Sequence, residues 1–167
     1  MTATTQRSPL IRQIDTHPRM ETWGVRVKIL VSATESGGKL SIIEYVAPPT
    51  GLGPPLHIHR EMDENFHIVT GEMNFQINDQ QLIAKPGTML HVPAGTPHAF
   101  WNTSNEPTTM LVTMAPGGFE NYLIELFQLA AKHPAPTNDV RPLIAQLGEK
   151  YDQVVVGPPP GTAKAKP

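Results

Sequence analysis

The sequence predicts a mainly β fold, a jelly-roll type barrel of roughly eight to ten short strands followed by α-helices. Turn-forming residues recur at short intervals along the chain, which has 18 prolines and 13 glycines among its 167 residues. The runs between these turns either alternate apolar and polar residues or are rich in β-branched residues, as strands are. From Phe119 onward the apolar residues change to helical spacing, which predicts the helices.

The barrel is expected over residues 23–116, after an irregular N-terminal arm over residues 1–22. This arm is polar except for three apolar residues, Leu10, Ile11 and Ile14. They are expected to dock on the barrel or on a partner subunit. The predicted strands cover residues 23–33, 40–47, 64–70, 73–78, 99–102 and 108–115. The connecting segments are rich in Gly, Pro, Asn and Asp, which predicts tight turns, including one over residues 35–39.

Residues 117–152 are expected to form two helices that pack on the outside of the barrel or over its mouth. The first covers residues 119–132, and its apolar residues share one face: Phe119, Tyr122, Leu123, Leu126 and Ala130. The second starts near Asn138 or Asp139, either of which can cap it. Residues 153–167 are rich in proline and glycine and show no packing signal, so they are expected to form a tail.

Three histidines and one glutamate have the spacing of a metal site built on strands. His57 and His59 are two residues apart, and such side chains point to the same side of a strand. The two prolines that precede them hold this stretch extended. Glu64 is predicted to open the next strand and to face back towards the two histidines. His98 leads a later strand, after a turn that contains proline and glycine.

Two blocks of the sequence resemble the two conserved motifs of the cupin superfamily. The first has the spacing G-x5-H-x-H-x4-E-x6-G and consists of Gly51, His57, His59, Glu64 and Gly71. The second has the spacing G-x5-P-x-G-x2-H-x3-N and consists of Gly87, Pro93, Gly95, His98 and Asn102. Residues 115–120 are also similar to small single-domain cupins of the quercetin-dioxygenase-like kind. The resemblance implies a double-stranded β-helix, the conserved cupin barrel, and a metal bound by His57, His59, Glu64 and His98.

Three neutral imidazoles and one carboxylate are suitable ligands for one divalent transition metal per chain. The spacing does not identify this metal, which can be Fe, Mn, Ni, Co, Cu or Zn. Four protein ligands leave two positions open on an octahedral ion for water, dioxygen or a substrate. Glu64 can also act as a catalytic base, because a carboxylate freed inside a dry pocket has a raised pKa. The alternative is a degenerate cupin whose site holds no metal.

Six apolar residues are expected to form core or the wall of a substrate pocket: Phe66, Ile68, Met73, Phe75, Met89 and Phe100. His67 is predicted to face away from Glu64 and to have a structural or interface role, and a surface or interface position is expected for His91. Trp101 is predicted to face away from His98. Together with the apolar residues of the arm, Trp101 predicts a homodimer that covers exposed sheet edges.

The composition argues against several classes of protein. The formal net charge is −2 and there is no block of Lys and Arg, which argues against nucleic-acid binding. The chain has no cysteine, so it forms no disulfide and offers no thiolate ligand. No apolar run has the length of a signal peptide or a membrane span, so a cytoplasmic protein is expected.

Two function classes stay open at this point. The first is an enzyme, a metal-dependent dioxygenase that acts on a small aromatic or enolic compound. In similar cupins a carboxylate at the Glu64 position removes a proton from the substrate. The second is a non-catalytic cupin that binds a small molecule or a metal. A cupin isomerase or lyase is a further alternative, because this fold carries many chemistries.

Overall fold

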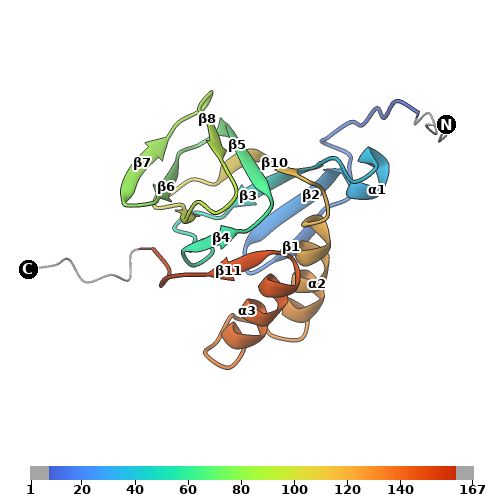
Figure 1. Cartoon of the computed structure of the whole chain (residues 1–167). Helices are drawn as coiled ribbons and strands as arrows, with labels where there is room; N and C mark the ends of the chain where they lie inside the picture. The colour runs from blue at the N-terminus through green and yellow to red at the C-terminus, as the bar shows by residue number, and fades with distance from the viewer. Residues whose placement is uncertain (1–7, 161–167) are drawn as a thin grey trace, which may run out of the picture.

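The computed structural model describes residues 8–160, and eleven strands within them form two antiparallel sheets (Figure 1). The six-stranded sheet has, in order, β1 (Met20–Thr22), β2 (Val25–Val31), β3 (Ser41–Ala47), β10 (Thr108–Ala115), β5 (Asp63–Thr70) and β8 (Met89–Val92). The five-stranded sheet has β11 (Gln153–Val155), β4 (His57–His59), β9 (His98–Trp101), β6 (Met73–Ile77) and β7 (Gln80–Ala84). The predicted mainly β fold is therefore confirmed.

The core lies between the inner faces of these sheets and follows from the alternation of side chains along each strand. In β10, Met110, Val112 and Met114 are buried, and the residues between them are half-buried. Their register partners on β5 include Ile68 and Phe66, which are fully buried. Alternate residues of a strand share one face, so the apolar halves of both strands fill the interior.

Two details of the first strands differ from the prediction. The strand predicted from residue 23 begins at Val25, because Trp23 (φ 48°) and Gly24 (φ 80°) adopt left-handed conformations that turn the chain between β1 and β2. The turn predicted at 35–39 overlaps the end of a short helix, α1 (Ala33–Ser36). The side chains of Ser32 and Glu35 cap the N-terminus of this helix reciprocally.

The two predicted helices are present as α2 (Glu120–Ala130) and α3 (Arg141–Lys150), and they lie next to each other below the barrel in Figure 1. The prediction that Asn138 or Asp139 caps the second helix is wrong, because Val140 occupies that position and makes no side-chain cap bond. The helix α2 buries Tyr122 and Leu123 against the barrel core. The helix α3 contacts both α2 and β11.

The expected tail without packing is wrong for residues 153–155, which form β11. This strand pairs with β4, with Gln153 opposite His59 and Val155 opposite His57. The pairing continues beyond the strand, since the backbone nitrogen of Leu56 donates to the carbonyl of Pro158. The physical reason is that β4 would otherwise present an unpaired edge. Residues 161–167 of the expected tail lie outside the described residues.

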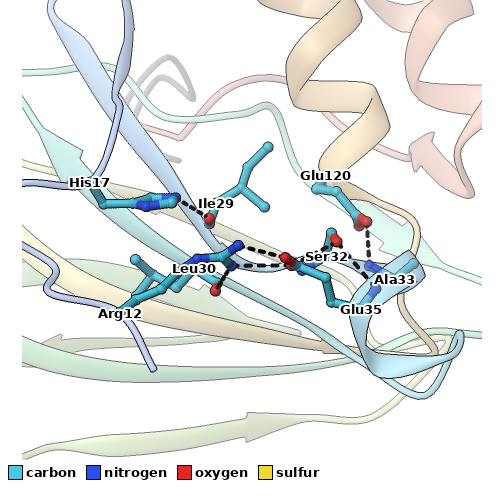
Figure 2. Close-up of polar contacts among 8 residues, drawn as sticks. All are labelled: Arg12, His17, Ile29, Leu30, Ser32, Ala33, Glu35 and Glu120. Atoms are coloured by element: carbon cyan, nitrogen blue, oxygen red, sulfur yellow. Dashed lines mark hydrogen bonds and ion pairs between the residues drawn. The ribbon is translucent and has the colours of Figure 1, made fainter. Parts of the chain in front are cut away.

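Residues 8–22 of the N-terminal arm dock on the barrel of their own chain, and the last of them form β1, whereas residues 1–7 lie outside the described residues. Figure 2 shows Arg12 bound to the carbonyl of Leu30 and to the Glu35 carboxylate, with an Arg12–Glu35 distance of 2.5 Å. His17 Nε2 lies 2.8 Å from the carbonyl oxygen of Ile29. The hydrogen bond from Arg12 is the main reason why the pKa of Glu35 falls to about 2. Ile11, by contrast, is 90% exposed.

Gly53 lies on the approach to β4, directly against the backbone of Phe100. An ideal Cβ atom on Gly53 would lie 1.5 Å from the Phe100 carbonyl oxygen. We expect Gly53→Ala to lower the free energy of unfolding by about 3 kcal/mol or more, because the backbone must move to relieve this overlap.

Gly38→Ala is the matched control for this prediction. Its added Cβ meets nothing within 4 Å, so only the left-handed φ of 79° opposes it, at a cost of about 1–2 kcal/mol. Chemical denaturation of both variants measures the difference, and equal losses would contradict the proposed overlap at Gly53.

Candidate metal centre

Four buried side chains meet in the barrel interior: His57, His59, Glu64 and His98. One possible ligand atom from each lies within 4.8 Å of those of the others. Their side chains are almost inaccessible, with residue exposures between 1% and 5%. The structure thus brings together the four residues that the sequence pattern predicts as metal ligands.

The strand pairing explains this grouping. His57 and His59 lie on the same face of β4, and His57 is the register partner of His98 on β9. Glu64 comes from β5 in the other sheet, where it lies opposite Met114 and Val92. The carboxylate therefore faces the three imidazoles across the interior of the barrel.

Each imidazole is oriented by a backbone carbonyl. The Nδ1 atoms of His57 and His98 lie 2.9 Å from the carbonyl oxygens of Pro55 and Thr96. His59 Nδ1 lies 3.2 Å from the carbonyl oxygen of Asp152. A carbonyl only accepts, so Nδ1 carries the proton in all three rings and the lone pair of a neutral ring is on Nε2. This arrangement is typical of histidines that bind a metal through Nε2.

The inward-facing imidazole nitrogens and carboxylate oxygens do not satisfy one another's hydrogen bonding. His98 Nε2 is 2.7 Å from the Glu64 carboxylate, which satisfies that pair only if a proton lies between them. His59 Nε2 lies 3.3 Å from the same Glu64 oxygen, and it makes no hydrogen bond although it is buried. A buried acceptor without a partner is costly. A divalent cation would satisfy these atoms together, so the residues present fit such an ion.

Burial and the neighbouring charges shift the pKa values in the cluster. Burial, and then the nearby His98, lower the pKa of His57 to about 3, so His57 is neutral as a metal ligand must be. Burial alone would raise the pKa of Glu64, but the nearby imidazoles of His59 and His98 outweigh it and hold this pKa below its usual value. The rise in pKa predicted for a Glu64 carboxylate freed from a bound metal stays a prediction. Burial opposes ionisation of His98, yet its bond to Glu64 raises the pKa of His98.

Five of the six residues predicted as core or pocket wall are buried: Phe66, Ile68, Met73, Phe75 and Phe100. The ring of Phe66 lies 5.1 Å from Phe75 and 6.1 Å from His98, so the aromatic side chains pack directly beneath the cluster. The prediction is wrong for Met89, which is 63% exposed. Met89 on β8 is the register partner of His67 on β5. His67 lies on the face of β5 opposite to the buried Glu64 and Phe66, and Met89 lies on the same outer face.

The remaining histidines do not join the cluster. His91 is exposed on β8, and its Nδ1 lies 2.9 Å from the side-chain oxygen of Asn65. His67 is half-buried on β5, between register partners Leu111 and Met89. The interface roles predicted for these histidines and for Trp101 stay predictions.

Two residues next to the cluster, Asp152 and Phe119, were not predicted as site residues. Asp152 orients His59 through its carbonyl, and its carboxylate accepts hydrogen bonds at 3.0 Å from the backbone nitrogens of Arg60 and Glu61. The ring of Phe119 lies 5.0 Å from that of His59, edge to face. No local pattern identifies either contact, because both residues are far from His59 along the chain. Asp152, for example, is 93 residues away from it.

We expect Asp152→Ala to weaken zinc binding by about 10-fold, within the range seen when a group that orients a metal-binding histidine is lost. Alanine removes both loop contacts and disfavours the left-handed φ of 68° at this position. Asp152→Asn, which tolerates this φ and keeps an acceptor, should recover most of the affinity. Exposed Glu149→Ala is the control, and competition with a chromophoric chelator is the measurement. An unchanged affinity in Asp152→Ala would contradict the prediction.

Residues 44–114 match the Cupin_2 family model, described as a cupin domain, and this stretch contains all four residues of the cluster. Residues 44–114 thus form a cupin domain. The match ends before Phe119 and Asp152, so these two residues contact His59 from outside the cupin region.

Two of the curated relatives are described as a probable oxidoreductase and as a quercetin 2,3-dioxygenase. The cupin is 36% identical over 78 residues to the "Probable oxidoreductase virH" of Hypocrea virens, covering 45% of this chain and 36% of that protein. It is 33% identical over 92 residues to the quercetin 2,3-dioxygenase of Bacillus subtilis, covering 55% of this chain and 27% of that enzyme. The matched regions thus span about a third or less of each relative.

Solved structures show the same fold at lower identity. A predicted oxalate decarboxylase from Thermotoga maritima has a TM-score of 0.57 and 23% identity, with coverage of 65% of this cupin and 99% of that chain. This likeness concerns the fold alone. Within residues 8–160, no helix is both long and apolar enough to cross a membrane.

Proposed function

We propose that this cupin is a metal-dependent dioxygenase that acts on a small aromatic or enolic compound. The observation that carries the proposal is the buried cluster in which three imidazoles, each with Nδ1 bound to a carbonyl, turn Nε2 towards one carboxylate. Such a donor set suits one divalent transition metal, namely Fe, Mn, Ni, Co, Cu or Zn.

The curated relatives support the choice of reaction class. One is described as a probable oxidoreductase and one as a quercetin 2,3-dioxygenase, and both match about half of this chain at more than 30% identity. Only a part of each relative is matched, so their activities enter here as a proposal. An enolic aromatic substrate offers the oxygen atoms and the acidic proton that such a site can use.

The residues of the cluster have distinct roles in this proposal. His57, His59 and His98 hold the metal, and the carbonyls behind them prevent the rings from turning. When bound, the metal supplies Lewis acidity and access to dioxygen chemistry. Glu64 completes the donor set and accepts the proton of the substrate hydroxyl, for which its carboxylate must be ionised. The imidazoles of His59 and His98 hold the pKa of Glu64 below its usual value, which keeps the carboxylate ionised but also makes it a weaker base.

A non-catalytic binding cupin is the alternative, and one observation favours it. The four ligands are at most 5% exposed, so the cluster is closed to bulk solvent in this structure. A closed site suits a structural or storage role for a metal. A cupin isomerase or lyase would use the same cluster without consuming oxygen.

Oxygen uptake separates these alternatives. The protein is loaded in turn with each candidate metal and supplied with a flavonol and with other enolic aromatic compounds in an oxygen-electrode cell. The proposal predicts uptake with at least one redox-active metal, and none with the metal-free or zinc-loaded protein. Tight binding of the compounds without oxygen uptake for every metal would contradict the dioxygenase and favour the non-catalytic alternative.

A homodimer is also proposed, supported by the exposed apolar residues of the arm, since Leu10 is 46% and Ile11 is 90% exposed. A second copy of the chain would cover this surface. We expect light scattering to give about twice the chain mass of 18.3 kDa, and Ile11→Asp to shift it towards the monomer, unlike the exposed neighbour Gln13→Asp. A monomer mass for the wild type at micromolar concentration would contradict the dimer. The cytoplasmic location stays a prediction.

A further inference from the structure

A pocket of about 400 Å³ lies between the barrel and the C-terminal helices. It is formed by three segments far apart in the sequence: Glu61 and Met62 after β4, residues 116–119 with Asn121, and Lys150, Tyr151 and Asp152 at the end of α3. Its volume is within the range of small-molecule sites, roughly 300–1,000 Å³.

This pocket adjoins the metal cluster. Phe119 lines the pocket and also contacts the ring of His59, with 5.0 Å between the ring centroids. Asp152 lines it as well, and its carbonyl is the partner of His59 Nδ1. A single aromatic ring therefore separates the pocket from His59. The ring of Phe66 lies 6.1 Å from that of His98 and 5.1 Å from that of Phe75, so this part of the surroundings of the cluster is packed core.

We propose that this pocket binds the substrate, a planar aromatic compound with two adjacent oxygen atoms, and that the compound reaches the cluster past Phe119 on the side of His59. The inference rests on the proposed function for the class of substrate. It places the substrate between the barrel and the C-terminal helices, and it leaves the aromatic residues beneath the cluster as core.

The lining of the pocket suits a planar and largely uncharged compound. Phe119, Tyr151 and Met62 offer two aromatic rings and a polarisable side chain for stacking. The charged groups of the lining have both signs. Lys150 is paired with Glu125 at 2.7 Å, and the Asp152 carboxylate accepts two backbone hydrogen bonds, so neither presents a bare charge to the ligand.

Phe119 is 9% exposed and its ring stacks on that of Tyr122 with 4.8 Å between the centroids, so access to His59 from the pocket requires a rotation of the Phe119 side chain. Phe119 precedes the first residue of α2 and makes no side-chain cap bond there. Gly118 before it has a φ of 133°, and a Cβ at that position would meet nothing within 4 Å. Rotation of the Phe119 ring away from His59 would connect the pocket with the cluster.

Binding of 4-nitrocatechol to the zinc-loaded protein tests the pocket without any turnover, because zinc does not change its oxidation state. Its absorption changes when its oxygens bind a metal, and wild type should show this change in a saturable titration. Asn121→Trp fills the pocket from an exposed position on α2 and should weaken binding by about 10-fold or more, or 1.4 kcal/mol.

A matched control isolates the effect of filling. Gln128→Trp places the same indole at another exposed position on α2, outside the pocket lining, and should bind like the wild type. Zinc content and circular dichroism verify that each variant is folded and loaded.

Each outcome decides the proposal. If wild-type zinc protein does not bind 4-nitrocatechol, or if Asn121→Trp binds it as tightly as the wild type, the pocket is not the substrate site. If Asn121→Trp alone loses binding while no metal form consumes oxygen, the pocket stands and the dioxygenase fails. If oxygen uptake is found and is the same in Asn121→Trp, the dioxygenase stands and the pocket fails.

Discussion

Glu64→Gln should lower turnover by about 10²-fold or more, which is the usual contribution of a positioned general base. Glutamine keeps the volume and one oxygen ligand of Glu64 but does not accept a proton at neutral pH. The three imidazoles, each held by a backbone carbonyl, should still retain much of the metal. The expected result is therefore a protein that is loaded and folded but nearly inactive.

The comparison requires equal metal content in both proteins, verified by elemental analysis before oxygen uptake is measured. Glu72→Gln is the matched control, because the Glu72 side chain is 49% exposed and is not part of the cluster. Its turnover should equal that of the wild type. Equal turnover by wild type and Glu64→Gln would show that Glu64 is not the base.

The second large effect is expected in metal binding. His98→Ala should weaken zinc binding by about 10²-fold or more, beyond the usual effect of losing a residue that only supports a ligand. His98 provides an inward Nε2 atom 2.7 Å from Glu64, so its removal deletes one donor and leaves the buried carboxylate without its closest partner. Part of the loss is therefore the cost of an unpaired carboxylate.

His91→Ala is the control for this prediction, since His91 is exposed on β8 and is not among the clustered residues. Competition against a chromophoric chelator gives both zinc affinities. Thermal unfolding with and without zinc is a second readout, because a metal that binds only the folded state raises its stability. Similar affinities for His98→Ala and wild type would exclude His98 from the site.

The parts that the sequence predicts well are those set by local patterns. The alternation along residues 64–70 places Glu64, Phe66 and Ile68 on one face, and all three are buried. The i and i+2 spacing of His57 and His59 places both imidazoles inside. Such periodicities depend on backbone geometry alone, so they can be predicted from the sequence without a structure.

The features that were not predicted depend on contacts between distant segments. The strand β11 has only three residues, and its stability comes from the free edge of β4. The roles of Asp152 and Phe119 follow from this pairing and from the docking of α2. Met89 was misassigned because the register of β8 against β5 decides which of its residues face outward, and four residues are too few to indicate it.

The location of the metal is measured by anomalous diffraction from crystals of freshly purified protein, at the absorption edge of the metal that elemental analysis finds. We predict one anomalous peak per chain, bounded by Nε2 of His57, His59 and His98 and by a carboxylate oxygen of Glu64. A metal-free protein with no peak there, or a peak at any other group of residues, would contradict a metal centre at these four residues.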